Sequence, residues 1–263
     1  KYHDKTKELE SFGFVNNESV DPKCGEQTDY EAYAKSTFDN SKRGLFIAND
    51  VTSKYSRRNK MEYYKIASYI YEIIKSKPGN YMVFFPSHAF LASVLKHFQD
   101  SFYDEADMEL LVQEEYMNEE MREQFLLEFS KKNADKSLVG FCVLGGIFSE
   151  GIDLKNDLLI GAIIVGTGLP MVCNEREILK DAFDDEDADG FDYAYRYPGM
   201  NKVLQAAGRV IRTVEDVGII ALLDDRFLQF SYKKMFPREW DNYEIVNLDT
   251  VASRVDRFWN EWL

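Results

Sequence analysis

The chain has 263 residues, 45% of them hydrophobic, which is enough to bury one substantial core without disulfides or metal ions. No apolar run approaches the roughly 20 residues that a membrane-spanning helix needs, and the charged residues 1–10 lack the apolar centre of a secretory signal. The formal net charge of -14 argues against a protein that simply coats nucleic acid, because phosphate contacts normally require concentrated Lys and Arg. We therefore expect a cytoplasmic protein without a membrane segment.

The cysteine and histidine content predicts neither a metal site nor a disulfide framework. The three cysteines are odd in number and widely separated: Cys24, Cys142 and Cys173. Disulfide frameworks and zinc sites use more closely spaced cysteines, and an iron–sulfur cluster needs about four. The three histidines are equally dispersed. We expect reduced, structural thiols, no bound metal and no iron–sulfur cluster in this segment.

The first third of the chain divides into a lead-in and the start of a folded domain. Residues 1–40 contain glycine and proline and show no sustained hydrophobic period, which predicts a loop-rich lead-in to a domain over 41–263. The apolar run Gly44–Ala48 predicts a buried strand. Isoleucines at helical spacing predict a helix over 60–76, which the following proline and glycine end.

From residue 81 onward, short apolar runs alternate with longer segments of helical periodicity. The expected strands cover 81–85, 108–112, 137–144, 158–165 and 218–223. The expected helices cover 86–99, 118–132, 201–212 and 248–263. This alternation predicts an α/β fold with a mainly parallel sheet flanked by helices, and the nearly continuous apolar strand 158–165 belongs at its centre. The acid-rich segment 181–192 predicts a solvated, mobile loop.

The string from Gln205 to Arg212, Gln-Ala-Ala-Gly-Arg-Val-Ile-Arg, contains the strongest candidates for chemistry. On a helix, one face would present Gln205, Gly208, Arg209 and Arg212. The other face would pack against the sheet through Val203, Leu204, Ala207 and Ile211. Two guanidinium groups one turn apart, beside an amide, suit the oxygens of a phosphoryl group. A mid-helix glycine costs about 1 kcal/mol relative to alanine, which indicates close approach of a ligand. The structural alternative is an amphipathic helix whose arginines face water.

Two further strings stand directly after predicted strands. The glycine-rich run Gly145–Asp153 follows strand 137–144, and Pro86 with Ser87 follows strand 81–85. Ligands of open α/β sheets bind at the carboxyl ends of strands, where glycines and helix starts present backbone amides to phosphates. Taken singly, a glycine-rich turn and an N-cap serine explain these residues equally well.

Together the three strings resemble motifs VI, V and IV of superfamily-two helicases, and Tyr197–Leu204 extends the likeness to the DinG/XPD branch. Phe46–Tyr55 resembles the start of that family's second motor domain, and Leu222–Phe227 resembles the strand that closes it. The resemblance runs from about Ser36 to the C-terminus. It implies a RecA-like domain of the P-loop NTPase type, from an ATP-dependent DNA helicase acting in repair or replication.

The same resemblance implies roles for individual residues. Arg209 and Arg212 would stabilise transition-state charge, and Gln205 would position the attacking water or sense the phosphate. The residues expected at the nucleotide are Glu150, Gly151, Asp153 and Gly208. Of these, Glu150 and Asp153 would couple the nucleotide to the bound DNA strand. The residues expected to contact single-stranded DNA are Pro86, Ser87, Gly146 and Ser149.

The sequence contains neither a Gly-x-x-x-x-Gly-Lys-Ser/Thr phosphate loop nor an Asp-Glu-x-His box, which the family keeps in its first motor domain. We therefore expect half a motor, inactive alone, that works on ATP with Mg²⁺ held mainly by the first domain in cis. A second interpretation stays open. The acidic charge and the missing phosphate loop also fit a non-catalytic nucleic-acid or protein interaction module with the fold of a helicase half.

Overall fold

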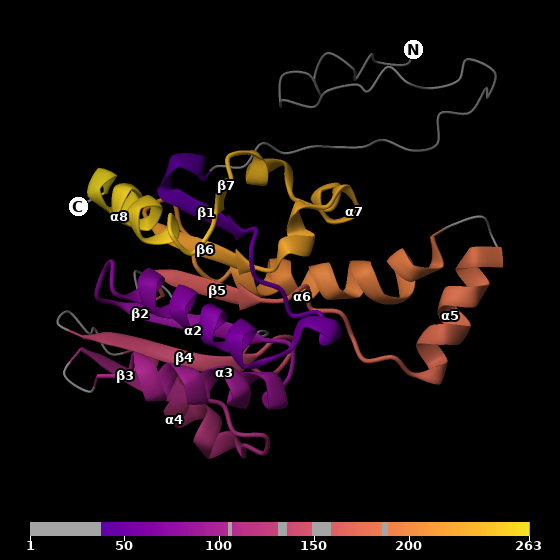
Figure 1. The fold of residues 1–263 in the computed structure, drawn as a ribbon, viewed down its shortest axis with the longest axis horizontal. Helices are drawn as coiled ribbons and strands as arrows, with labels where there is room; N and C mark the ends of the chain where they lie inside the picture. The colour runs from indigo at the N-terminus through magenta and orange to yellow at the C-terminus, as the bar shows by residue number, and fades with distance from the viewer. Residues whose placement is uncertain (1–37, 105–106, 131–135, 149–158, 186–188, 263) are drawn as a thin grey trace, which may run out of the picture. The chain divides into compact units, whose positions relative to one another are not determined.

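The computed structural model describes residues 38–104, 107–130, 136–148, 159–185 and 189–262. A single compact unit spans Asn40–Leu263 and is built on a seven-stranded sheet with helices on both faces (Figure 1). This architecture confirms the predicted α/β class. The predicted lead-in at residues 1–40 falls almost wholly outside the described residues and stays a prediction.

The strands are β1 (Arg43–Ala48), β2 (Asn80–Phe85), β3 (Met108–Val112), β4 (Ser137–Val143), β5 (Gly161–Val165), β6 (Gly218–Leu223) and β7 (Glu244–Val246). Their order across the sheet is β3-β4-β2-β5-β6-β1-β7, and all the pairings are parallel. β5 lies in the middle, as its apolar sequence predicted. The short edge strand β7 has no counterpart among the expected strands, because three residues give no readable hydrophobic period.

The helices are α2 (Lys60–Ile74), α3 (His88–Ser101), α4 (Glu119–Phe129), α5 (Asn174–Asp185), α6 (Tyr197–Ala207), α7 (Phe230–Lys233) and α8 (Val251–Glu261). Short helical turns complete the domain: η1 (Asn40–Lys42), η2 (Tyr55–Arg57), η3 (Asp192–Arg196), η4 (Asp225–Leu228) and η5 (Arg238–Asp241). Side-chain oxygens cap the starts of α2, α3 and α4, from Asn59, Ser87 and Asn118. None of the described helices is both long and apolar enough to cross a membrane.

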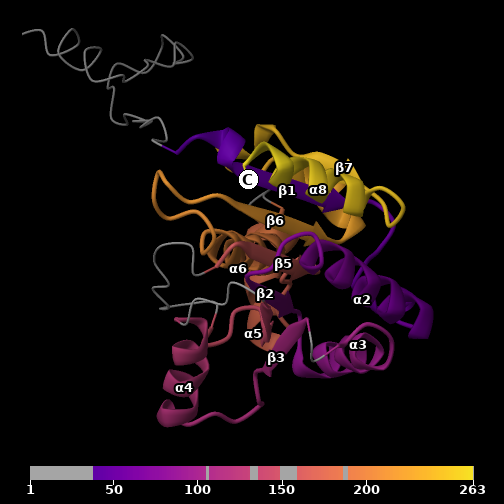
Figure 2. The same ribbon diagram turned by 90° about the vertical axis from the view of Figure 1, so that its left-hand side faces the viewer.

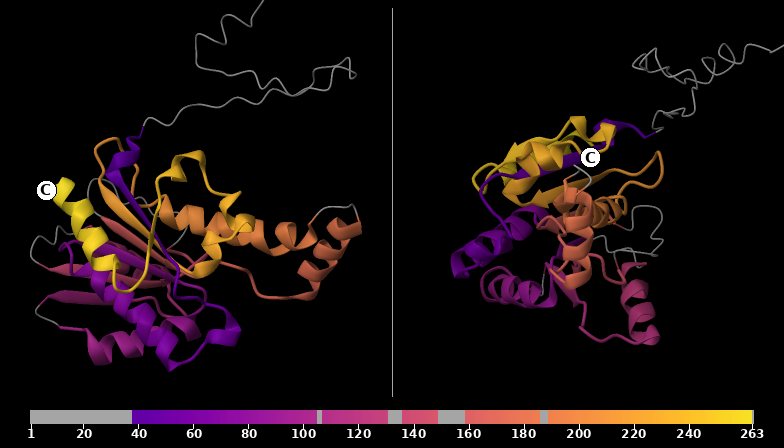
Figure 3. Two further views of the ribbon diagram at one scale, coloured as in Figure 1. Left: turned by 45° about the horizontal axis from the view of Figure 1, so that its top comes forward. Right: turned by 90° about the vertical axis from the view of Figure 1, so that its right-hand side faces the viewer.

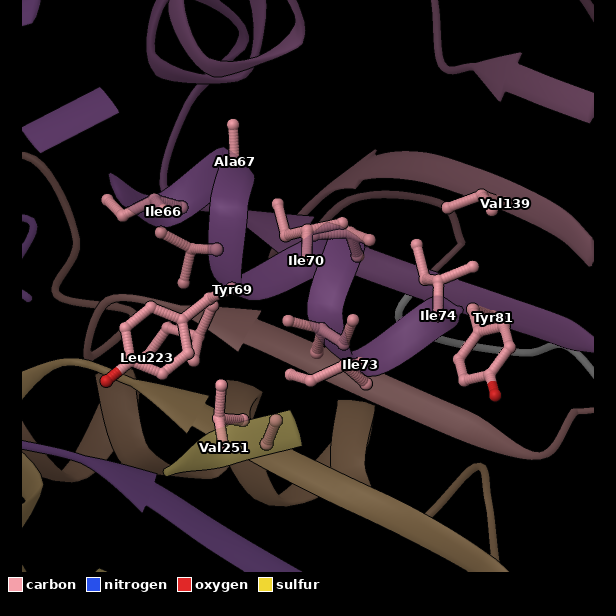
Figure 4. Close-up of a cluster of buried hydrophobic side chains, with 14 of the residues drawn as sticks. Ile66, Ala67, Tyr69, Ile70, Ile73, Ile74, Tyr81, Val139, Leu223 and Val251 are labelled. Carbon is pink, nitrogen blue, oxygen red and sulfur yellow. The ribbon is translucent and has the colours of Figure 1, made fainter. Parts of the chain in front are cut away.

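Alternate side chains along each strand face two separate apolar layers. On β2, Tyr81 and Val83 contribute to the layer under α2, α3 and α8, whereas Met82 and Phe84 face the layer under α4 and α6. Figure 2 shows α2 and α3 on one side of the sheet and α4 on the other. Figure 4 shows the first layer, where isoleucines of α2 pack over β2, β4 and β6. Burial on both faces explains why the strands read as continuous apolar runs.

The helix predicted over 201–212 is shorter and shifted towards the N-terminus, because α6 ends at Ala207. The N–H of Gly208 still bonds to the Leu204 carbonyl, at 2.9 Å, but the next two N–H groups turn to carbonyls three residues back. Gly208 therefore occupies the helix end rather than its middle. The prediction that two arginines share one helical face with Gln205 is wrong, although the apolar side of α6 faces the sheet as expected.

In its described parts, 181–185 and 189–192, the acid-rich segment is exposed to solvent in places but is not the loop that its composition predicted. Its first residues belong to α5 and its last residue begins η3. The Arg176 guanidinium donates to the Ala194 carbonyl, at 2.6 Å, and the Phe183 ring stacks on Tyr193 with centroids 4.0 Å apart. These contacts with η3 thus stabilise a helix that the charge pattern alone disfavours.

Candidate functional site at the two ends of the sheet

The carboxyl ends of parallel strands meet at one edge, and this edge holds the described residues that were expected at nucleic acid. Pro86 and Ser87 follow β2, and Gly146 follows β4. β2 and β4 are neighbours, paired from Asn80 to Phe85. The structure therefore brings these three residues to adjacent strand ends, as the sequence predicted.

Ser87 is the N-cap of α3, whose first turn faces the carboxyl edge of the sheet. Its hydroxyl oxygen accepts the Phe90 N–H at 3.3 Å. The structural interpretation of Ser87 as a cap is therefore correct. It leaves the hydroxyl proton available to donate, so capping and contact with an anion are compatible at this residue.

The turn after β4 depends on two glycines. Gly145 has a φ of 74°, and a Cβ there would lie 2.7 Å from Cδ of Lys202 and 3.0 Å from its Nζ. Gly146 donates its N–H to the Val143 carbonyl at 3.1 Å, so this amide closes the turn. The Lys202 ammonium, absent from the predicted site, is thereby held beside the strand ends. Its position one helical turn before Gln205 was the available signal.

The remaining residues of the glycine-rich run, Ser149, Glu150, Gly151 and Asp153, lie outside the described residues. Their expected contacts with nucleotide and strand stay predictions. The described chain stops after Phe148, near the carboxyl edge, and resumes at Leu159 just before β5.

The arginine turn, defined here as residues 208–213, lies at the opposite edge of the sheet. The start of α6 packs on the segment after β5, where a Cβ at Gly168 would lie 2.5 Å from the Gly199 carbonyl oxygen. Its end reaches the first residue of β6, because Val210 packs on Gly218. α6 thus runs antiparallel to the strands, as a crossover helix must. The expectation that all three motifs line one edge is wrong.

The candidate residues of the arginine turn and of the preceding end of α6 differ in exposure. Arg209 is buried, with 8% of its surface exposed. Arg212 is half-buried, whereas Gln205 and Gly208 are exposed. A ligand from outside thus meets the amide and the glycine first.

Asp216 holds the backbone of the arginine turn and was missed by the sequence reasoning. Its buried carboxylate accepts the N–H groups of Arg212 and Thr213 through one oxygen, both at 2.7 Å. Two charge-assisted hydrogen bonds to consecutive amides fix the direction in which Arg212 leaves the chain. An acid between the last arginine and the following strand was the signal in the sequence.

A second buried carboxylate, Asp224, ties the carboxyl ends of β1 and β6 together. Arg226 donates to both of its oxygens, from Nε and Nη2, at 2.8 Å each. Ser53 donates to the same carboxylate from its N–H at 2.8 Å and from its hydroxyl at 2.9 Å. The Thr52 hydroxyl adds a bond of 3.2 Å. Asp224 is therefore fully engaged in joining two strand ends and has a structural role.

The ionisation of Asp224 follows from these contacts. Burial by itself would raise the pKa of this carboxyl, but the hydrogen bonds and charge of Arg226 act against burial, with help from the Ser53 N–H. The net effect holds the pKa of Asp224 below its ordinary value, so the carboxylate stays ionised at neutral pH.

Comparison with known proteins identifies relatives of this chain. A family model described as the helicase C-terminal domain matches residues 70–243. A probable ATP-dependent helicase of Methanocaldococcus jannaschii is 25% identical over 236 residues, which cover 85% of this chain and 35% of that protein. The ATP-dependent DNA helicase XPD of Sulfolobus acidocaldarius is 29% identical over 72% of this chain and 32% of its own length.

Two further comparisons point to the same branch. The 3′-5′ exonuclease DinG of Staphylococcus epidermidis is 28% identical over 76% of this chain and 21% of its own length. A solved XPD structure superposes with a TM-score of 0.62 at 25% identity, over 78% of this chain and 40% of that one. The chain thus spans about a third or less of the curated relatives cited here. It belongs to the helicase C-terminal domain family, in the DinG/XPD branch.

Proposed function

We propose that this domain is the C-terminal half of an ATP-dependent DNA helicase that couples ATP hydrolysis to translocation on single-stranded DNA, in repair or replication. The names of the relatives support this proposal, because several of them are ATP-dependent helicases. Its partner in the same protein would be the first helicase domain, which would hold most of the ATP and its Mg²⁺. The relatives are long enough to contain such a domain.

The arginine turn is the observation that carries the nucleotide side of the proposal. Arg209 and Arg212 leave one turn, and Asp216 holds the backbone at Arg212 in place before a ligand arrives. Facing the γ-phosphate across the domain interface, they would neutralise charge in the transition state, and Gln205 would orient the attacking water. Gly208 leaves space at the helix end for the phosphates. Glu150, Gly151 and Asp153, which follow Ser149 in the chain, are the other residues proposed to contact the nucleotide.

The carboxyl edge would hold the DNA strand. Ser87 would donate its hydroxyl proton to a backbone phosphate, beside the first amides of α3 and next to Pro86. The Lys202 ammonium adds a positive charge above Gly145, and Gly146 and Ser149 would complete the contact. Because these contacts would read phosphates rather than bases, they suit movement along any sequence.

α6 provides a physical link between the two sides. The first turns of α6 carry Lys202 at the carboxyl edge, where the DNA strand would bind. The arginine turn follows the last residue of α6 at the opposite edge, where the nucleotide would bind. A helix of 11 residues packed on the sheet transmits displacement at one end to the other. Closure of the interface around ATP would therefore shift the strand contacts relative to the first domain.

The proposal is tested by comparing the longer protein, expressed with its upstream region, with the 263-residue chain. The longer protein should hydrolyse ATP, with stimulation by oligothymidylate, whereas the chain alone should show no hydrolysis above background. Stimulated hydrolysis that needs the upstream region supports the motor. A longer protein that binds nucleic acid or another protein without hydrolysing ATP would instead support the interaction module.

Asp216→Ala in the longer protein should lower the kcat of DNA-stimulated ATP hydrolysis by about tenfold with little change in KM, because Arg212 loses its fixed direction. Asp216→Asn keeps a carbonyl oxygen that accepts the same two N–H groups, and should recover most of the rate. Steady-state kinetics on both variants measures this difference. Equal rates in wild type and Asp216→Ala would show that the turn needs no such support.

A further inference from the structure

The α5 arm, defined as residues 169–185 and 189–192, leaves the sheet after β5 and leads into α6. Figures 1 and 3 both show α5 standing clear of the sheet. Its main packing partner is η3, which follows it in the chain. The arm therefore carries a surface that the core of the domain does not cover.

The inner face of α5 is fixed by specific contacts. Arg176 and Phe183, which lie on this face, meet Ala194 and Tyr193 of η3 through the hydrogen bond and ring stacking described above. Lys180, one turn after Arg176, pairs with Asp184 at 3.1 Å. These contacts hold the helix in one orientation, so its opposite face is presented to solvent by the fold itself.

Large apolar side chains are exposed in the segment before α5 and on α5 itself, and we call the surface that carries them the outer face of the arm. The side chains of Met171 and Ile178 are 87% and 70% exposed, and their sequence neighbours Val172 and Leu179 are 74% and 41% exposed. Scattered exposed apolar residues need no explanation, but four within residues 171–179 form a concentration that usually marks an interaction site. Leaving them in water brings no benefit to this domain alone.

The charge around these apolar residues selects the kind of partner. Residues 174–192 contain nine acids and two bases, which accounts for half of the net charge of -14. Glu175 and Asp181 are exposed on the same helix as Ile178 and Leu179. DNA and RNA would be repelled by this surface, because their affinity depends on cations. A chain that carries Lys or Arg around large apolar residues is complementary to it.

We propose that the outer face of the α5 arm docks a basic amphipathic segment of a partner protein. Large apolar side chains of the partner would cover Met171, Val172, Ile178 and Leu179, and its cations would face the flanking acids. Segments of this kind bind apolar surfaces as helices, through residues spaced three and four apart. The residues of this docking surface are different from Ser87 and from those of the arginine turn.

Fluorescence anisotropy with a defined probe tests this proposal on the 263-residue chain. The probe is a labelled helical peptide of about 18 residues with Leu on one face and Lys on the other. Ile178→Glu and Met171→Glu should each weaken its binding by about tenfold or more. Leu127→Glu makes the same change at an exposed apolar residue of α4 and should stay within twofold of wild type.

Two controls separate docking from general attraction between opposite charges. A peptide with the same composition but no apolar face should bind at least about tenfold more weakly than the probe. Equal weakening by Leu127→Glu, or unchanged binding in both arm variants, would overturn the proposal. So would an oligothymidylate that competes with the probe and loses its own binding in Ile178→Glu. Both arm variants alter exposed residues, so circular dichroism should show wild-type folding.

Discussion

Arg209→Ala in the longer protein is expected to reduce DNA-stimulated ATP hydrolysis by roughly 10³-fold, the scale on which a transition-state arginine acts in phosphoryl transfer. The guanidinium would place two N–H donors against the oxygens that gain charge as the γ-phosphate leaves. Binding of ATP should change far less, because in the proposed function the first domain would supply most of the ground-state contacts. The predicted signature is a loss of kcat with a nearly unchanged KM, measured in steady state.

Two variants make this experiment specific. Arg209→Lys keeps the charge but loses the planar pair of donors, so it should remain roughly 10²-fold impaired if two-pronged contact matters. Arg257→Ala removes an exposed arginine that pairs with Glu244 at the edge strand β7, and should stay within twofold of wild type. Arg209→Lys measures the effect of donor geometry at constant charge, and Arg257→Ala measures the effect of removing a positive charge elsewhere on the domain.

Arg209 is mostly buried, so a loss of rate must be distinguished from a loss of structure. The melting temperatures of the Arg209 variants therefore need to be measured beside their rates. A variant that melts like wild type and hydrolyses ATP slowly supports the assigned role. Full activity in Arg209→Ala would remove Arg209 from the mechanism.

The sequence predicted most of the sheet because burial on both faces leaves a strong trace in the residues. Strands such as 81–85 and 218–223 are continuous apolar runs, and in the structure β2 and β6 match them within one residue. The central position of β5 followed from the same property. The short strand β7 left no such trace, because its pairing with β1 depends on backbone hydrogen bonds that no sequence period encodes.

The candidate site was predicted by residue type better than by position. Pro86, Ser87 and Gly146 lie where strand ends were expected, because chain order alone places residues that follow parallel strands at one edge. To place Arg209 correctly, one must know where α6 ends. Local hydrogen bonds set that end, and the hydrophobic period of the sequence continues beyond it. Asp216 acts on a backbone four residues away, a contact that periodicity does not reveal.

The α5 helix was missed for a different reason. Its acids repel one another, so composition indicated a loop, and only its contacts with η3 make the helix favourable. The Arg176–Ala194 contact joins residues on either side of the acid-rich run, and it becomes visible once the chain is folded. The charge pattern therefore predicts a loop where the structure has a helix, because contacts on one face stabilise this helix while its other face is solvated.

Asp224→Ala should destabilise the domain by about 3–5 kcal/mol, the usual result of removing one partner from a buried ion pair. Asp224 is fully buried, and its loss would leave the Arg226 guanidinium and the Ser53 N–H without their acceptor. Urea unfolding of the 263-residue chain measures the difference. For a domain of this size the melting temperature should fall by about 2–4 °C per kcal/mol.

The neighbouring residue provides a matched control. Asp225 pairs with Lys54 at 3.2 Å, but both side chains are partly exposed. Asp225→Ala should therefore cost no more than about 1 kcal/mol. If the two alanine variants were equally stable, the buried network around Asp224 would contribute nothing beyond an ordinary surface pair.

The same network predicts how stability depends on pH. Because folding lowers the pKa of Asp224, its carboxylate stabilises the fold fully above the pKa of the unfolded chain, about 3.9. That contribution disappears as the pH falls through the lower pKa of the folded state. Asp224→Asn cannot ionise, so its deficit relative to wild type should be constant from neutral pH down to about pH 5 and should shrink below about pH 4. A deficit that stays the same at pH 3 would mean that hydrogen bonding alone, without the charge, joins β1 to β6.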